Sequence, residues 1–332
     1  MHDMSLLYVV VFLALAFDYI NGFHDTANAI ATSVSTRAIK PQYAIAMAAM
    51  LNFAGALYST GVAKTIGGDL VKSASMVNQH VFIAALIGAT LWNLITWWYG
   101  IPSSSSHALV GGVVGAVIVS KGFAALKIAG IQKILLSLVL SPIIALTTGY
   151  VIMVLLLWIF GRVPPFRVNT GFKSAQWLSA SLMSFSHGSN DAQKAMGIIT
   201  LALLSAGQIP SLEVPMWVKL GCASAMALGT AAGGWKIIKT MGGRIVKLEP
   251  INGFAADLNS ALVIFMATHF ALPVSTTHVV SGSIMGVGSA KRVSAVRWNV
   301  AQQMGYAWVL TIPCTAFVSA LTYKIVSMIW NV

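Results

Sequence analysis

Residues 22–29 read GFHDTANA and residues 188–195 read GSNDAQKA, and each stretch lies inside a long apolar run. Aligned without a gap, the two octets share their glycine, their aspartate and their final alanine. The shared aspartates are Asp25 and Asp191, 166 positions apart. Because a charged residue is costly within an apolar run, its recurrence in a related octet indicates an internal repeat.

Two further pairs of segments repeat in the same order along the chain. KTIGG at 64–68 matches KTMGG at 239–243, and PSSSSH at 102–107 matches PVSTTH at 273–278. The offsets of these pairs, 175 and 171 residues, are close to that of the octets. Chance does not readily supply three collinear matches, so the sequence predicts a duplication.

The composition places this duplicated chain in a lipid bilayer. Of the 332 residues, 57% are hydrophobic and only 8% are charged, and the mean hydropathy is +0.81. A soluble protein needs roughly a quarter of its residues charged to cover its surface. A helix spans the bilayer core with about 20 apolar residues, and apolar runs of that length recur. We therefore expect an all-α polytopic membrane protein.

The charge balance has a simple explanation in such a protein. The formal net charge of +12 comes from 20 Lys and Arg against 8 Asp and Glu, a balance that in a soluble chain would suggest a nucleic-acid partner. Here the basic residues cluster between apolar runs, at 37–40, 162–173, 236–247 and 291–297. Cytoplasmic loops of membrane proteins are basic in this way. We therefore expect the lipid bilayer, and no nucleic acid, as a partner.

Two apolar runs are interrupted near their middle. The runs 81–119 and 256–289 are cut by Pro102 and Pro273, each followed by serine or threonine. We expect each run to form a broken, re-entrant hairpin that enters and leaves on the same side. Since proline favours the first turn of a helix, the hydroxyl clusters should open the second helix of each hairpin.

The charge of the loops orients the two halves. With the basic loops inside, each half has an odd number of crossings, so the second half starts on the opposite side of the membrane from the first. The sequence thus predicts two inverted-topology repeats, residues 1–160 and 175–332, joined by a cytoplasmic linker at 161–174, with both termini external. Many secondary transporters are built from inverted repeats.

A polar stripe lies on one helical face of the first apolar run, at positions i, i+3, i+7, i+10 and i+14. Its members are Asp18, Asn21, Asp25, Asn28 and Thr32, and the second half repeats the pattern with Ser184, His187, Asp191 and Lys194. A carboxylate at the bilayer centre costs about 2.5 to 3.5 kcal/mol, so it marks a functional site unless it only caps or pairs within the bundle.

We predict that this stripe binds the coupling ion. The predicted cation-coupling residues are Asp25, Asp191, Asn21 and Asn190. The coupling ion is a proton or a sodium ion, and with sodium the two aspartates would be metal ligands. No other cofactor is expected.

The two hydroxyl clusters predict an anion site. A helix N-terminus presents unpaired N–H groups and about half a positive charge, and two such ends at a repeat interface would surround a tetrahedral oxyanion. The alternative is that the hydroxyls only satisfy backbone groups at the break. The predicted anion-binding residues are Ser104, Ser105, Ser106, Ser275, Thr276, Thr277, His107, His278, Asn28 and Lys194. Either histidine could equally be an ordinary hydrogen-bonded residue of the bundle.

Carboxylates and an anion site in one cavity require a cation as well. Because neither charge is tolerated alone away from water, anion and cation binding become mutually dependent, which is the logic of a symporter. The halves differ at one position, where Asn28 is matched by Lys194. The lysine ammonium either takes the place of a sodium ion or binds the anion directly.

At these residues the sequence resembles the inorganic phosphate transporter (PiT) family, whose duplicated signature is visible at 22–29 and, altered, at 188–195. The likeness covers nearly the whole chain and is strongest to the bacterial low-affinity members. It implies uptake of inorganic phosphate through the plasma membrane by alternating access, external termini and a homodimer. It also implies proton coupling with phosphate carried as a neutral metal complex, or sodium coupling as in other members.

Three other functions compete with phosphate symport. The family also contains sulfate permeases, so a sulfate permease of the same fold is one alternative. An anion channel is another, although paired carboxylates would repel anions in the absence of a coupling ion. The third is an intramembrane enzyme using Ser106 and His107. Adjacent residues on a helix point about 100° apart, so this pair is not a contacting nucleophile and base, and we expect no enzyme.

Overall fold

The computed structural model describes residues 2–330, with the side chains of residues 2 and 3 left undescribed. Its first half contains α1 (His2–Ser35), α2 (Pro41–Tyr58), α3 (Gly61–Asp69), α4 (Gln79–Tyr99), α5 (Ser105–Lys121) and α6 (Ile128–Phe160). Its second half contains α7 (Pro165–Ser205), α8 (Met216–Ala232), α9 (Trp235–Lys239), α10 (Pro250–His269), α11 (Thr276–Lys291) and α12 (Trp298–Trp330). The short helical turns are η1 (Ala74–Met76), η2 (Phe123–Ala125), η3 (Thr240–Arg244) and η4 (Val293–Ala295). Residues 2–330 contain no β-strand, so the all-α prediction is confirmed.

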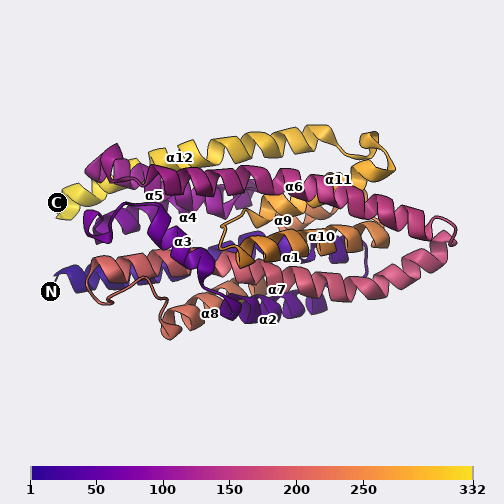
Figure 1. Ribbon diagram of the computed structural model, residues 1–332, viewed down its shortest axis with the longest axis horizontal. Coiled ribbons are helices and arrows are strands. Elements are labelled where there is room, and N and C mark those ends of the chain that lie inside the picture. The colour runs from indigo at the N-terminus through magenta and orange to yellow at the C-terminus, as the bar shows by residue number, and fades with distance from the viewer. Residues whose placement is uncertain (1, 331–332) are drawn as a thin grey trace.

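The two halves run in opposite directions. Figure 1 shows α1 leaving the N-terminus at the left and α7 returning from the right, and α6 and α12 are opposed in the same way. Both of these long helices have 33 residues and one internal proline, Pro142 and Pro313. The chain ends lie together at one end of the molecule, and the connection between the halves lies at the other (Figure 1). This is the arrangement expected of inverted repeats.

Most of the predicted linker at 161–174 is helical. Helix α7 begins at Pro165, so residues 165–174 of the expected linker are helical and only 161–164 connect α6 to α7. Proline at the first position of α7 explains the early start, because its fixed φ suits a helix and its missing N–H has no intrahelical partner there.

Both broken hairpins are present. The first consists of α4 and α5 and the second of α10 and α11, and the proline of each lies between its two helices. α5 starts at Ser105 with Ser104 as its N-cap, and α11 starts at Thr276 with Ser275 as its N-cap. Pro102 and Pro273 therefore precede the cap by two residues, which corrects the expectation that they occupy the first turn. A serine cap satisfies a backbone N–H at the helix start, and the stretch before a cap is non-helical, where proline fits.

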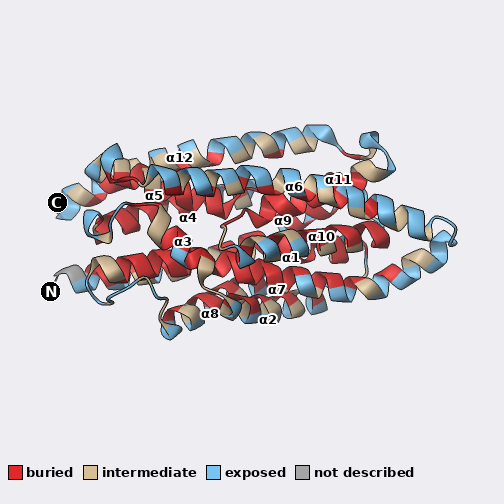
Figure 2. Cartoon of the chain, viewed as in Figure 1, coloured by how far each residue is buried: buried red, intermediate tan, exposed pale blue. Residues whose placement is uncertain are grey.

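Length and apolar composition identify the spanning helices. Among residues 2–330, five helices are long and apolar enough to cross a membrane, or six if α2 and α3, bent by 66°, form one span. Figure 2 shows buried residues concentrated in the middle of the bundle and exposed residues along α6 and α12. Their exposed faces carry large apolar side chains such as Trp158 and Val309. The chain is an integral membrane protein whose outer helices face lipid.

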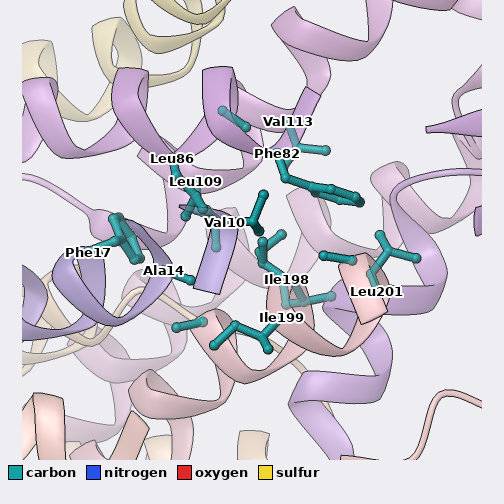
Figure 3. Packing of buried hydrophobic residues seen from close by; sticks show 14 of the residues in the cluster. Val10, Ala14, Phe17, Phe82, Leu86, Leu109, Val113, Ile198, Ile199 and Leu201 are labelled. Carbon is teal, nitrogen blue, oxygen red and sulfur yellow. The ribbon is translucent and has the colours of Figure 1, made fainter. Parts of the chain in front are cut away.

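The halves are joined by reciprocal packing. α6 packs on α11 and α12 packs on α5, while α2 packs on α7 and α1 on α8. Each long helix thus supports the hairpin of the other half. A buried apolar cluster fills the end near the termini, where Phe17 of α1, Phe82 of α4, Leu109 of α5 and Ile198 of α7 lie close together (Figure 3). This cluster fixes the first hairpin, α4 and α5, relative to α1 and α7.

Gly188 allows α7 to approach the backbone of α2. A Cβ at this position would lie 2.2 Å from the carbonyl oxygen of Asn52, and a Cβ at its counterpart Gly22 would lie 2.4 Å from that of Met226. We expect Gly188→Ala to destabilise the protein by about 1 to 3 kcal/mol through overpacking. Thermal unfolding in detergent would measure this. The control is Gly171→Ala in the same helix, where nothing lies within 4 Å, and equal melting temperatures for the two variants would contradict the prediction.

Candidate functional site

Asp25 lies where the two hairpin tips meet α1. Its carboxylate accepts the Ser105 hydroxyl from α5 and the Thr277 hydroxyl from α11, each at 3.3 Å. His24 Nδ1 lies 2.6 Å from the same carboxylate. The Asp25 side chain is 2% exposed. One carboxylate therefore links the first turns of α5 and α11. The sequence had led us to expect these two helix starts at one interface.

Asp191 holds the corresponding position on α7. Its carboxylate accepts the Thr276 hydroxyl at 3.3 Å and the Asn21 amide at 3.5 Å. The Lys194 ammonium lies 2.7 Å from it, and His187 Nε2 lies 3.7 Å away. All five side chains are buried. The second aspartate thus has an ammonium group from its own helix, whereas Asp25 has an imidazole.

Asn28 completes the ring of polar groups between the aspartates. Its amide nitrogen donates to the hydroxyls of Thr277 at 3.0 Å and Thr276 at 3.3 Å. Its carbonyl oxygen is buried and has no partner among the described residues. The structure therefore brings together eight of the predicted site residues: Asn21, Asp25, Asn28, Ser105, Asp191, Lys194, Thr276 and Thr277.

Three of these groups are arranged so that they can hold a small cation. One ligand atom each from Asp25, His187 and Asp191 lies within 4.8 Å of the others. Two carboxylate oxygens and a neutral imidazole suit a cation, and amide or hydroxyl oxygens can add to the set. Lys194 already supplies one positive charge to Asp191.

The remaining predicted residues have other contacts. Ser104 and Ser275 accept the backbone N–H of His107 and His278 as caps, at 3.2 and 3.3 Å. Ser106 donates to the Val274 carbonyl at 2.9 Å. These three hydroxyls satisfy backbone groups at the breaks, which was the alternative interpretation of the clusters.

Asn190 fastens a hairpin instead of joining the two aspartates. Its amide nitrogen donates to Thr268 at 3.0 Å and to the Leu272 carbonyl at 3.2 Å, and its oxygen accepts the Val274 N–H at 3.3 Å. Its counterpart in the first octet, His24, contacts Thr96 at 3.2 Å in the same way. The residue before each aspartate therefore contacts a hairpin near its break: His24 joins α1 to the first hairpin, and Asn190 joins α7 to the second.

The two histidines after the hydroxyl clusters face one another. The rings of His107 and His278 are 4.6 Å apart, and His278 stacks on Trp308 at 3.9 Å. His107 Nδ1 also lies 2.7 Å from the Ser104 hydroxyl. Their contacts join the hairpins to each other and to α12.

The site and the duplication have a counterpart in known proteins. The sequence matches the Phosphate transporter family over residues 21–168 and 162–319. The chain belongs to this phosphate transporter family. The resemblance inferred from the octets and the hydroxyl clusters is confirmed.

The transporter is similar along its length to bacterial proteins of the same kind. It is 54% identical over 329 residues to a probable low-affinity inorganic phosphate transporter of Bacillus subtilis (strain 168), covering 98% of this chain and 99% of that one. It is 48% identical to one of Rhizobium meliloti (strain 1021), covering 96% of each. The solved structure of a protein named the sodium-dependent phosphate transporter matches with a TM-score of 0.87 and 26% identity, over 98% of this chain and 100% of that one. These relatives are named as transporters, in agreement with the expectation that the chain is not an enzyme.

Sequence reasoning missed two side chains that support the breaks of the transporter. Trp308 of α12 donates its indole N–H to the Pro102 carbonyl at 3.1 Å, and Ser137 of α6 donates to the Pro273 carbonyl at 2.6 Å. The two donors are 171 residues apart, as are the two prolines. The offset of the repeat could therefore have paired them, although their different chemistry hid the equivalence.

Trp308 is expected to position the first hairpin. Trp308→Phe retains a ring against His278 but removes the donor to Pro102, and we expect uptake to fall about fivefold for the loss of about 1 kcal/mol. Initial uptake rates in proteoliposomes would measure this. Trp298→Phe is the matched control, because that indole also donates to a backbone carbonyl, of Val293, but at an exposed helix start. A Trp308 variant as active as the control would contradict the assignment.

Proposed function

We propose that the chain takes up inorganic phosphate together with a proton, by alternating access across the plasma membrane. The observation that carries the proposal is the contact of both hairpin tips with one buried carboxylate, Asp25, through Ser105 and Thr277. The relatives are named for inorganic phosphate, and a helix start with hydroxyl donors suits this oxyanion. The hairpins of an inverted repeat meet at this point, so that moving either one would open the site to a different side.

The hydrogen bonds explain how anion and cation binding depend on each other. In this arrangement the hydroxyls of Ser105, Thr276 and Thr277 donate to carboxylates. A proton on Asp25 removes its negative charge and weakens the hydrogen bonds that it accepts from Ser105 and Thr277. These hydroxyls can then donate to phosphate instead. Without the proton, the anion would face two carboxylates in a site shielded from water. Phosphate and the proton therefore bind best together.

Lys194 favours a proton over sodium. Its ammonium lies 2.7 Å from Asp191, where a metal ion would otherwise neutralise that carboxylate. The counterpart Asn28 carries no charge, so the lysine adds a permanent cation to the second half alone. Sodium coupling has its own support in the grouping of Asp25, His187 and Asp191 and in the similarity of the fold to a protein named for sodium dependence.

Uptake of radiolabelled phosphate into proteoliposomes tests the proposal. Sodium and pH gradients are imposed separately, and unlabelled sulfate is added as competitor. We expect acid outside to drive accumulation without sodium and sulfate to compete weakly. A requirement for sodium would replace the proton by a metal ion at the two aspartates, and strong competition by sulfate would favour the sulfate permease. Anion current without either gradient would indicate a channel.

The remaining features of the proposal concern the assembly and the form of the substrate. We propose that both termini are external, that the transporter is a homodimer, and that phosphate can enter as a neutral metal complex. Basic segments at 236–247 and 291–297 support the cytoplasmic side chosen for the loops. Labelling of a cysteine placed next to either terminus by a membrane-impermeant reagent on intact cells tests the orientation.

A further inference from the structure

A line of buried polar groups leads from the site towards the end of the molecule where the halves connect. Asn28 and Thr32 of α1 are followed by Thr36, the first residue after the helix, at intervals of four residues, so all three lie on one side. Thr32 lies two turns beyond Asp25, about 10 Å along the helix axis. All three side chains are buried, and the exposed Arg37 follows directly. We call Asn28, Thr32 and Thr36 the α1 polar line.

Each of the two threonines contacts a buried polar side chain of another helix. Thr32 donates to an oxygen of Asp257 on α10 at 2.5 Å, and Thr36 donates to the amide oxygen of Gln176 on α7 at 2.6 Å. Three atoms along this line have no partner among the described residues, namely Asn28 Oδ1, Asp257 Oδ2 and Gln176 Nε2. Buried polar atoms are almost always hydrogen-bonded to protein or water, so orphans at successive levels indicate a hydrated path.

Asp257 is a carboxyl group without a compensating charge. It is 1% exposed, and none of the ion pairs formed by the described residues includes it. Its neighbours are the hydroxyls of Thr32 and Ser179. An ionised carboxylate in such surroundings costs several kcal/mol, whereas a protonated one is neutral and can donate to water.

Most charged and titratable groups on the helices packed against α10 have partners other than Asp257. Arg167 and Lys173 of α7 are exposed, and the buried Asp18 of α1 lies on the far side of Asp25 from Thr32 along the helix. On α7, His187 and Lys194 lie against Asp191. On α11, His278 stacks on Trp308, and Lys291 pairs with Glu249 at the start of α10. On α1, Asp25 contacts His24. On α3, Asp69 pairs with Lys127 and Lys133 and Lys64 lies by Glu213, and residues 134–160 of α6 contain no Asp, Glu, His, Lys or Arg.

We propose that Asp257 holds a proton and relays it between the phosphate site and the basic end of the molecule, along the hydrated α1 polar line. The proposal rests on the proton coupling proposed above. Asp257 releases its proton through water past Gln176 and regains one, from the side of the phosphate site, through water at Asn28. No bond other than O–H is made or broken, and the number of protons is conserved. Without the relay, the site binds phosphate but cannot discharge its proton to the basic side.

The test separates phosphate exchange from proton-driven accumulation in proteoliposomes. Exchange of labelled for unlabelled phosphate requires no net proton movement, whereas accumulation against a gradient does. We expect Asp257→Asn to retain exchange within about twofold and to lose at least about tenfold in pH-driven accumulation, because the amide binds no proton. Asp257→Glu keeps a carboxyl group and is expected to restore accumulation. Asp69→Asn, which alters a carboxylate paired with Lys127 away from this line, is the control for both assays.

Each outcome decides the assignment. Accumulation by Asp257→Asn at the wild-type level would overturn it, and an equal loss of exchange and accumulation would indicate a structural role only. If the variant does not fold, Asp257→Glu still decides, because the C=O band of a protonated, buried carboxyl group in infrared spectra at neutral pH must change its frequency with this substitution. Sodium-driven uptake by the wild type would refute the proposed proton coupling itself, whereas proton-driven uptake by both proteins would refute only the relay.

Discussion

Asparagine in place of Asp25 is expected to reduce phosphate uptake about 100-fold, equivalent to about 2.7 kcal/mol. The carboxylate accepts one hydroxyl from each hairpin, and charge-assisted hydrogen bonds of this kind contribute about twice as much as neutral ones. An amide binds no proton and turns one acceptor into a donor that faces Ser105 or Thr277. The variant therefore loses both the coupling charge and the link between the hairpins.

Initial uptake of labelled phosphate at a fixed pH gradient measures this effect. Asp69→Asn is the matched control, because it makes the same chemical change at a carboxylate that pairs with the half-exposed Lys127 and Lys133. Half-exposed pairs of this kind contribute little to stability. An Asp25 variant that retains more than about a third of the uptake rate, less than 1 kcal/mol from wild type, would remove Asp25 from the site.

Lys194→Asn should destabilise the transporter in sodium-free buffer by about 3 to 5 kcal/mol, because it leaves Asp191 buried without its ammonium partner. The substitution introduces the residue that the first half already has at the equivalent position, Asn28. Sodium ions should then bind beside Asp191, within reach of Asp25 and His187, and restore the melting temperature. The wild-type protein should not respond to sodium, since Lys194 supplies the charge.

The double variant Asp191→Asn with Lys194→Asn completes the comparison. Removing both members of a buried pair is often nearly neutral for stability, so this protein should melt near the wild-type temperature, with or without sodium, and should not transport phosphate. Thermal unfolding followed by tryptophan fluorescence, with and without sodium chloride and with choline chloride as the salt control, gives all the required values. If Lys194→Asn melted at the wild-type temperature and ignored sodium, the lysine would have no role as an internal cation.

The sequence determined the class of the protein and identified most of the side chains that the structure brings together around Asp25 and Asp191. Its apolar runs exceed the length of a bilayer span, and an aspartate in such a run must face protein or water, so the polar stripe around Asp25 and Asp191 had to point inwards. The duplication then placed both stripes and both hydroxyl clusters at one interface, because related halves pack about a common axis. Thr276, Thr277 and Lys194 lie there, in contact with the two aspartates.

Only the tertiary structure decided which neighbouring hydroxyls meet the carboxylates. Ser104 and Ser105 are adjacent and chemically identical, yet Ser104 caps α5 and Ser105 donates to Asp25. The reason is that α5 begins at Ser105, and consecutive side chains at a helix start point about 100° apart. Asp257 and Thr32 are 225 residues apart and have no counterparts in the repeat pattern. Periodicity shows which face of a helix is buried, but the partner on that face depends on how distant helices pack.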